Sequence, residues 1–207
     1  MVFDFSKGRL TYRKPNVDDA QAEKWQSFHF ATRLKLEGAT YFCGQLLGAA
    51  SLHMNLGLPL LAHRQREWYL ATFFFELCSA YDTLLQEINI LYGYGLSRRE
   101  VKWKAVVPKL PESLKEMMSR DRGVDWFKKV HWYRNTATHH QLIPMGESAG
   151  GWGEQTWDMD MHEAMIFYID EQINEPREEN ITVCKEYLKK MLEHIHNAWS
   201  EMGQRFN

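Results

Sequence analysis

The chain has 207 residues, enough for one compact domain and too few for two of ordinary size, so we expect residues 1–207 to fold as a single domain. Hydrophobic residues make up 44% of the chain and charged residues 25%, which excludes disordered, collagen-like and mucin-like classes. The net charge of −2 excludes a uniformly basic protein, but residues 95–140 carry +6 and residues 141–207 carry −8, so these segments either create local fields or pair within the fold.

The first predicted segment, residues 1–15, carries charges every few positions and lacks the apolar stretch of a secretory signal, so we expect a cytoplasmic protein. Two short apolar clusters flank the turn-like sequence SKGR and predict a small N-terminal hairpin. The uncharged stretch 38–63 is long enough to span a bilayer. Because Gln45, His53 and Pro59 interrupt it, we predict a soluble helix and no membrane partner.

Two long helices are predicted next. The first covers residues 17–56, a proline-free run that opens with acidic residues, and Pro59 is predicted to end it. Gly44 and Gly48 lie four apart on this helix and predict a close crossing with another helix. The second covers residues 64–92, where apolar residues recur every three or four positions as in an antiparallel bundle.

The remaining chain is predicted as short pieces and two more core helices. Prolines break residues 97–120 into short segments, and helices follow over residues 124–140 and 178–204. Between these helices, residues 142–172 turn at a glycine-rich sequence and then alternate apolar with acidic side chains. The sequence therefore predicts a mostly α fold, an antiparallel helical bundle of four or five helices with a small β-hairpin insertion.

The sequence lacks the motifs of several common metal-binding, catalytic and phosphate-binding sites. The three cysteines are 35 and 106 residues apart with no CxxC pair, which predicts buried thiols in a reducing compartment. Among the histidines there is no HExxH, and His194 and His196 lie about 200° apart on a helix, so we predict no metal and no cofactor. A GxSxG elbow and a phosphate-binding loop are also missing.

One segment gathers reactive side chains: HWYRNTATHH, residues 131–140. On a helix, an apolar stripe that faces the core is formed by Trp126, Val130, Tyr133 and Ala137. The exposed or interfacial side carries His131, Arg134, Asn135 and His139. Because Asn135 and His139 are four residues apart, the amide can bind one imidazole nitrogen and define which nitrogen is available for proton transfer.

The motif Arg134-Asn135-x-x-x-His139 resembles the Arg-x(4–6)-His motif, often Arg-Asn-x-x-x-His, of the HEPN superfamily (higher eukaryotes and prokaryotes nucleotide-binding). Domains of that family are antiparallel helical bundles of about this size, with the motif toward the C-terminal end of a late core helix. The resemblance covers residues 17–140 and the final helix, and it leaves out the two predicted hairpins.

The resemblance implies a metal-independent endoribonuclease that acts as a homodimer, with the Arg-His pairs of two subunits facing one cleft. RNA supplies its own nucleophile, the 2′-hydroxyl, so such a site needs a base with a pKa near neutrality and a fixed cation. The motif implies His139 as the base, Arg134 as the cation and Asn135 as the residue that orients His139. Arg134 and His139 lie about 140° apart on one helix, and a twofold axis overcomes that separation by juxtaposing two copies.

Two further residues are auxiliary candidates. His131 lies one turn before Asn135 and either assists the site or acts only as a surface hydrogen-bonding group. Asp82 belongs to a polar stripe on the second helix, which also contains Ser79, Gln86 and Asn89. This stripe is either a solvated face or, as in some HEPN domains, a source of a polar residue that reaches the cleft.

Two classes of function remain open. The intact motif favours a ribonuclease that cuts single-stranded RNA, a toxin or defence effector whose partner is an antitoxin such as a nucleotidyltransferase-like protein. The acidic final third and the lack of a strongly basic patch favour a non-catalytic HEPN module that binds a nucleotide, nucleic acid or a partner protein. Cleavage of RNA in the presence of EDTA distinguishes the two.

Overall fold

The computed structural model describes residues 17–54, 59–139 and 178–206, and 87% of this part of the chain is helical, without a strand. The mostly α class is therefore confirmed. The elements are α1 (Asp19–Met54), α2 (Pro59–Leu91), α3 (Trp103–Val106), the 3-10 helix η1 (Val107–Lys109), α4 (Glu112–Gly123), α5 (Asp125–His139) and α7 (Glu178–Phe206). Both predicted hairpins, at residues 1–15 and 142–172, lie outside the described residues.

The helix boundaries follow the sequence prediction closely except around Pro59. This proline was expected to end the first helix, but α1 already ends at Met54, and Pro59 is the first residue of α2. A proline is well tolerated there, because the first residues of a helix donate no intrahelical hydrogen bond and the fixed φ of proline suits a helix. The second helix consequently begins five residues before the predicted start at residue 64.

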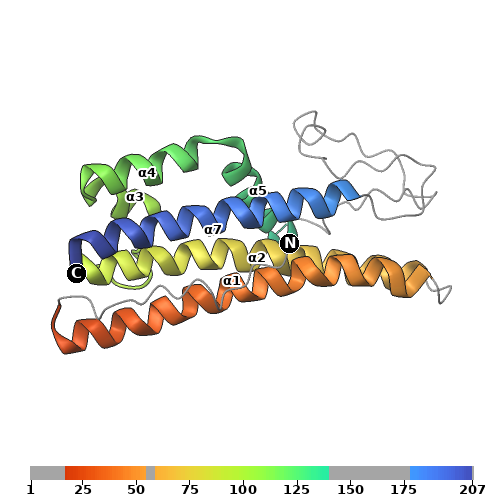
Figure 1. Cartoon of the computed structure of the whole chain (residues 1–207), viewed down its shortest axis with the longest axis horizontal. Coiled ribbons are helices and arrows are strands. Elements are labelled where there is room, and N and C mark those ends of the chain that lie inside the picture. The colour runs from red at the N-terminus through yellow and green to blue at the C-terminus, as the bar shows by residue number, and fades with distance from the viewer. Residues whose placement is uncertain (1–16, 55–58, 140–177, 207) are drawn as a thin grey trace.

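Three long helices, α1, α2 and α7, lie side by side (Figure 1). Helix α2 runs antiparallel to α1, and α7 runs in the same direction as α2 (Figure 1). Helix α5 packs against α2, α4 and α7, and α4 also contacts α7. Helix α2 thus has protein on two sides, with α1 on one and α5 on the other.

Aromatic contacts fix how α5 lies on α2. The rings of Phe74 and Tyr133 stack with their centroids 4.5 Å apart, and Tyr81 meets Phe127 edge to face at 4.8 Å. All four side chains are at most 1% exposed. Large buried rings contribute heavily to core stability and prefer these geometries, so this pair of contacts sets the register between the two helices.

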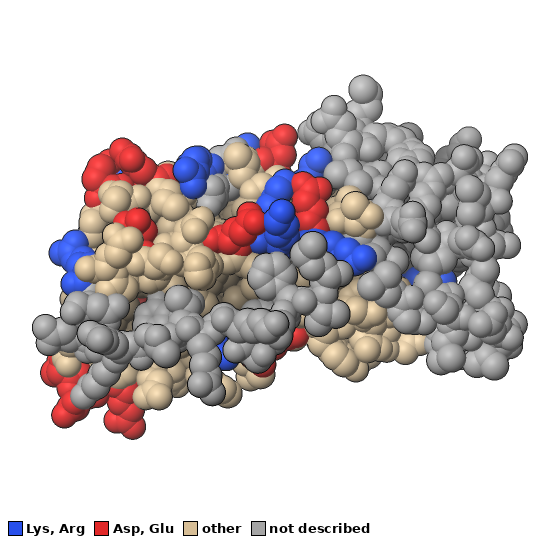
Figure 2. All heavy atoms as spheres, in the orientation of Figure 1, with Lys and Arg blue, Asp and Glu red and all other residues tan. Residues whose placement is uncertain are grey.

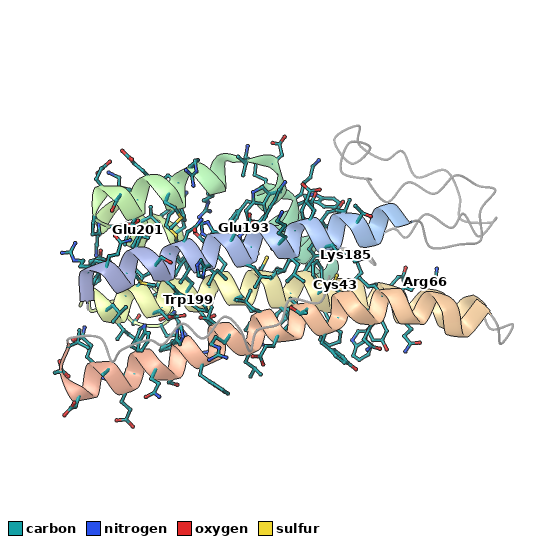
Figure 3. The ribbon with its side chains drawn as sticks, viewed as in Figure 1. Cys43, Arg66, Lys185, Glu193, Trp199 and Glu201 are labelled. Carbon is teal, nitrogen blue, oxygen red and sulfur yellow. The ribbon has the colours of Figure 1, made fainter. Side chains whose placement is uncertain are left out.

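A buried carboxylate joins α1, α2 and α7. Glu87 is fully buried, and its oxygens lie 3.0 Å from His29 Nδ1 and 3.1 Å from Trp199 Nε1, which donates to it. The Thr32 hydroxyl also donates to this carboxylate. Trp199 extends from α7 toward the other two helices (Figure 3). Burial raises the pKa of Glu87, whereas these hydrogen bonds lower it.

The end of α2 is closed by a turn that polar side chains brace. Gly93 and Gly95 have φ values of 63° and 68°, a backbone region that glycine adopts at little cost. Asn89, which is buried, donates from Nδ2 to the Leu96 carbonyl at 3.0 Å and accepts from the Leu96 N–H at 3.1 Å. At this end, therefore, the polar stripe of α2 is not a solvated face.

The prediction that another helix crosses closely at Gly44 is wrong. Gly44 is exposed, and no described atom lies within 4 Å of the position that a Cβ would occupy. The surroundings of Gly48 are not among those described. Within the described ranges, no helix combines the length and the apolar character needed to cross a bilayer.

Candidate functional site

The candidate motif lies on α5, the helix that packs across α2. Asp125 stands in its first turn, where a carboxylate interacts favourably with the helix N-terminus. Val130 and Tyr133 of the predicted core stripe are buried, Trp126 is half-buried, and the side chain of Ala137 lies outside the described part. Phe127 is a further core residue that the stripe did not include. This packing leaves the side of α5 that carries the motif at the edge of the α2–α5 interface.

Arg134 is half-buried, and its Nη1 donates to Oδ1 of the neighbouring Asn135 at 3.0 Å. Asn135 is exposed. The hydrogen bond holds one edge of the guanidinium along the helix surface. A guanidinium restrained in this way loses less side-chain entropy when it binds a second anion or acceptor.

His139 is the last residue of α5, and its side chain lies outside the described part. Ideal helix geometry places its Cα about 7.5 Å along the axis from that of Arg134, and about 140° around it. The pairing of Arg134 with His139, within one subunit or between two, stays a prediction.

His131 is half-buried between α5 and α2, so the alternative of a surface hydrogen-bonding group is wrong. Its ring centroid lies 4.8 Å from that of Phe127 and 6.1 Å from that of Tyr81, and Nδ1 lies 3.8 Å from Cys78 Sγ. Burial is the main reason that the pKa of His131 falls to about 4, and nearby Arg122 and Arg134 add to the effect. The imidazole is therefore neutral near pH 7.

Cys78, the neighbour of His131 on α2, is buried, and its thiol donates to the Val130 carbonyl with Sγ 3.7 Å from the oxygen. Burial, with a smaller effect of the negative charge of Asp82, raises the pKa of this thiol to about 12, although Arg134 acts in the opposite direction. The protonated thiol is a poor nucleophile, so Cys78 packs rather than reacts.

Asp82 comes from α2 and lies where α2 meets α5. It keeps an exposed side, yet loss of surrounding water raises the pKa of its carboxyl group, while Arg134 and Arg122 lower it. Both arginines thus lie within electrostatic range of this carboxylate. Asp82 is exposed but interacts electrostatically with Arg134 of the motif.

Five side chains therefore influence one another electrostatically where α2, α4 and α5 pack together, and we call them the α2–α5 cluster. They are Cys78 and Asp82 from α2, Arg122 from α4, and His131 and Arg134 from α5. Sequence reasoning missed two of them. Cys78 could have been found, because it lies four residues before Asp82 and so shares its helix face. Arg122 comes from a different helix, and no local pattern indicates it.

Arg122 is held in place by Trp103. Its guanidinium carbon lies 4.4 Å from the centroid of the Trp103 ring, the geometry of a cation–π contact. Trp103 in turn stacks near Tyr81 with a centroid separation of 6.3 Å. The short helix α3, which carries Trp103, is thereby tied to the same part of α2 that bears Asp82.

Charges on the face seen in Figure 2 are mixed. Basic and acidic side chains are interspersed over the described surface, including along α7, where Lys185 and Glu193 are exposed (Figures 2 and 3).

Among the described residues, no group of three His, Cys, Asp or Glu side chains could hold a metal ion. Comparisons of the chain with family models, with curated proteins and with solved structures find no match.

Proposed function

We propose that the protein is a metal-independent endoribonuclease of the HEPN type that cuts single-stranded RNA in the cytoplasm. One observation carries the proposal: the helix that bears Arg134, Asn135 and His139 packs on α2 so that Asp82 lies within electrostatic range of Arg134. The long antiparallel helices and the position of the motif at the end of α5 also support it.

Asn135 can link the two reactive side chains through a single oxygen. An amide oxygen has two lone pairs, and Oδ1 of Asn135 already accepts one hydrogen bond from Arg134. The second lone pair can accept the N–H of His139, one helical turn further on. That bond would leave the other imidazole nitrogen unprotonated and ready to act as a base.

The reaction then needs only these side chains and the RNA. His139 takes the proton of a 2′-hydroxyl, and the 2′-oxygen forms a bond to the adjacent phosphorus. The bond from phosphorus to the 5′-oxygen breaks, and that oxygen takes up a proton from water. Arg134 binds the phosphoryl oxygens, on which negative charge develops. The products are a 2′,3′-cyclic phosphate and a 5′-hydroxyl, and His139 returns its proton to water.

His131 does not fit the role of base. With its pKa near 4 and Nδ1 close to the Cys78 thiol, it is too weakly basic to compete with an imidazole of ordinary pKa. We assign it a positioning role at the junction of α2 and α5. Asp82 orients the guanidinium of Arg134 by charge.

The proposed enzyme acts as a homodimer. The arginine and the histidine project from one helix in directions about 140° apart, so two copies around a twofold axis supply a site that one copy lacks. As a toxin or defence effector, it would be held inactive by an antitoxin, for which a nucleotidyltransferase-like protein is our candidate.

Incubation of the purified protein with end-labelled RNA in EDTA tests the proposal. We expect fragments that end in a 2′,3′-cyclic phosphate, and a rate at least about 100-fold lower for His139→Ala or Arg134→Ala. His196→Ala removes an exposed histidine from α7 and should cut RNA at the wild-type rate. A pure, folded protein that cuts no RNA, or variants that cut as fast as wild type, would contradict the proposal.

A second candidate function is a non-catalytic HEPN module. The mixed charges of the face in Figure 2 favour it, because a nucleic-acid-binding surface usually concentrates positive charge. Binding of a nucleotide, nucleic acid or protein partner without any cleavage is the outcome that this candidate predicts.

A further inference from the structure

The outward side of the α1–α2 pair carries large apolar side chains, although the outer side of a bundle helix is usually polar. Five of these side chains are between 45% and 66% exposed, and we call them the α1–α2 apolar face. They are Phe30, Leu34 and Tyr41 of α1 and Trp68 and Phe75 of α2. None of the other described helices covers them.

Helix α7 shows what a solvated outer side looks like in this protein. Its exposed side chains include Lys185, Glu186, Lys189 and Glu193, two of which are labelled in Figure 3. Charged side chains of this kind interact well with water and suit the free surface of a bundle. The α1–α2 apolar face has the opposite character, which is typical of a surface that binds another molecule.

The face is continuous across the two helices. On each helix its residues recur at intervals of four or seven, which places them on one side of that helix. The ring centroid of Phe42 lies 5.3 Å from that of Tyr41 and 6.2 Å from that of Trp68. Lys35 Nζ of α1 lies 5.7 Å from the centroid of the Phe75 ring of α2. The five residues therefore form one surface and are not scattered apolar positions.

The charges that lie within this surface are paired with each other. Lys35 forms an ion pair with Glu76, in which Nζ and Oε2 are 3.0 Å apart. The pair brings one positive and one negative charge between the two helices, beside Phe75. A twofold axis sets a surface against its own copy, so unpaired like charges in its middle would repel each other. This surface can meet its own copy without that repulsion.

The exposed area matches what a homodimer interface requires. A large aromatic side chain offers about 150–250 Å², so the five residues at their observed exposure offer roughly 500 Å² of apolar surface. A standard interface covers about 800 Å² on each partner, and about 65% of a homodimer interface is apolar. The α1–α2 apolar face thus has nearly all the apolar surface that one subunit of a stable homodimer contributes.

We propose that the α1–α2 apolar face binds the same face of a second copy of this chain across a twofold axis. The inference names the interface of the homodimer, and it rests on the proposed function for the requirement of two copies. Asp82 follows Phe75 by seven residues on α2, so the face leads along this helix toward the α2–α5 cluster. The five residues are distinct from the motif, so substitutions in the face can alter association without altering the reactive side chains.

Sedimentation equilibrium of the full chain tests the inference without RNA. We expect wild type at about 10 μM to show twice the monomer mass of 24.5 kDa. Leu34→Glu brings a carboxylate from each subunit into the interface and should raise the Kd of the dimer at least about 100-fold. Leu34 is exposed and glutamate is a good helix former, so this variant should fold. A wild type that remains a monomer, or a Leu34→Glu protein with the Kd of the wild type, would overturn the inference.

Two further variants separate loss of the interface from loss of the fold. Val124 is an exposed apolar residue outside the face and stands directly before α5, where a carboxylate is favourable. Val124→Glu should dimerise as the wild type does. Trp68→Ala removes the largest ring of the face without adding a charge and should raise the Kd of the dimer about 30-fold. If Val124→Glu loses the dimer as well, or if Trp68→Ala keeps the Kd of the wild type, the face is not the interface.

RNA cleavage by the same proteins distinguishes failure of the inference from failure of the proposed function. If both are correct, Leu34→Glu should cut RNA at least about tenfold more slowly than wild type at a concentration where only wild type is a dimer. If wild type dimerises through the face but cuts no RNA, the proposed function falls and the inference stands. If RNA is cut and Leu34→Glu dimerises as wild type does, only the inference falls.

Discussion

Burial keeps His131 and Cys78 uncharged beside the charged side chains of the α2–α5 cluster. The pKa of the imidazole is near 4 and that of the thiol near 12, so neither group changes its charge between pH 5 and pH 10. Their neutrality avoids adding further positive charge next to Arg122 and Arg134, or a thiolate next to Asp82.

The low pKa of His131 predicts a loss of stability in acid. Unfolded histidine has a pKa near 6.5, so as the pH falls from 6.5 to 4 the unfolded chain binds a proton at this position and the folded chain does not. We expect wild type to lose about 2 kcal/mol more unfolding free energy across this window than His131→Gln does, allowing for the partial exposure of the ring. Urea unfolding of both proteins at pH 7, 6, 5 and 4 measures this difference in unfolding free energy.

His196→Gln is the matched control, since it removes an exposed imidazole from α7. Its loss of stability should run parallel to that of the wild type. If the unfolding free energy of His131→Gln falls with pH in parallel with that of the wild type, burial does not lower the pKa of His131.

Glu87 is the residue whose replacement should cost most stability. Glu87→Ala removes the carboxylate that accepts from Trp199 Nε1 and is one of several acceptors near the Thr32 hydroxyl, and we expect it to lower the free energy of unfolding by about 3–5 kcal/mol. Glu87→Gln keeps the shape and one acceptor oxygen and should cost about 1–2 kcal/mol.

Urea unfolding at pH 7 measures both Glu87 variants. The control is Glu186→Gln on α7, which breaks an exposed ion pair with Lys190 and should cost less than about 0.5 kcal/mol. Equal effects at Glu87 and Glu186 would show that the buried network contributes little.

At the scale of the element, Gly44 within α1 and Gly95 in the turn after α2 should respond to alanine in opposite ways. Gly44→Ala adds a methyl group to an exposed helical position with open space, and we expect a gain of about 0.5–1 kcal/mol from reduced backbone entropy. Gly95→Ala forces a side chain into a φ of 68° and should cost about 1 kcal/mol.

Thermal unfolding of the two variants side by side checks these signs. A loss of stability in Gly44→Ala would mean that another helix approaches this position after all. If Gly95→Ala leaves the thermal stability unchanged, the turn after α2 can accommodate a side chain. The two hydrogen bonds between Asn89 and Leu96, rather than the glycine, would then stabilise the turn.

The elements themselves were largely predictable, because apolar spacing and capping signals are local. Helix α5 was predicted over residues 124–140 and spans Asp125–His139. What escaped prediction depends on contacts between segments far apart in sequence. The sequence does not distinguish a Pro59 that ends the first helix from one that begins the second, because a proline can follow one helix or begin the next. Arg122 joins the cluster only because α4 folds back on α5 and α7.

At the scale of the whole molecule, the homodimer that we propose makes a prediction about mixed dimers. If the cation of one subunit works with the base of the other, Arg134→Ala and His139→Ala are each inactive alone but retain complementary halves. Mixing them under conditions that exchange subunits should restore about a quarter of the wild-type rate, because half of the dimers are mixed and each has one intact site.

The rate of RNA cleavage after mixing, compared with that of either variant alone, measures this restoration. Absence of recovery, when sedimentation or native mass spectrometry shows that mixed dimers have formed, would mean that each subunit carries a complete site of its own.

Helix α2 carries Glu87 and Asp82 five positions apart, which turns their side chains about 140° from each other around its axis. Glu87 is hydrogen-bonded to side chains of α1 and α7, and Asp82 interacts electrostatically with arginines of α4 and α5. Sliding α2 by a single residue would rotate both by about 100° and break both sets of interactions together. A displacement of α2 that disturbed the buried network of Glu87 would therefore also disturb the electrostatic interactions of Asp82.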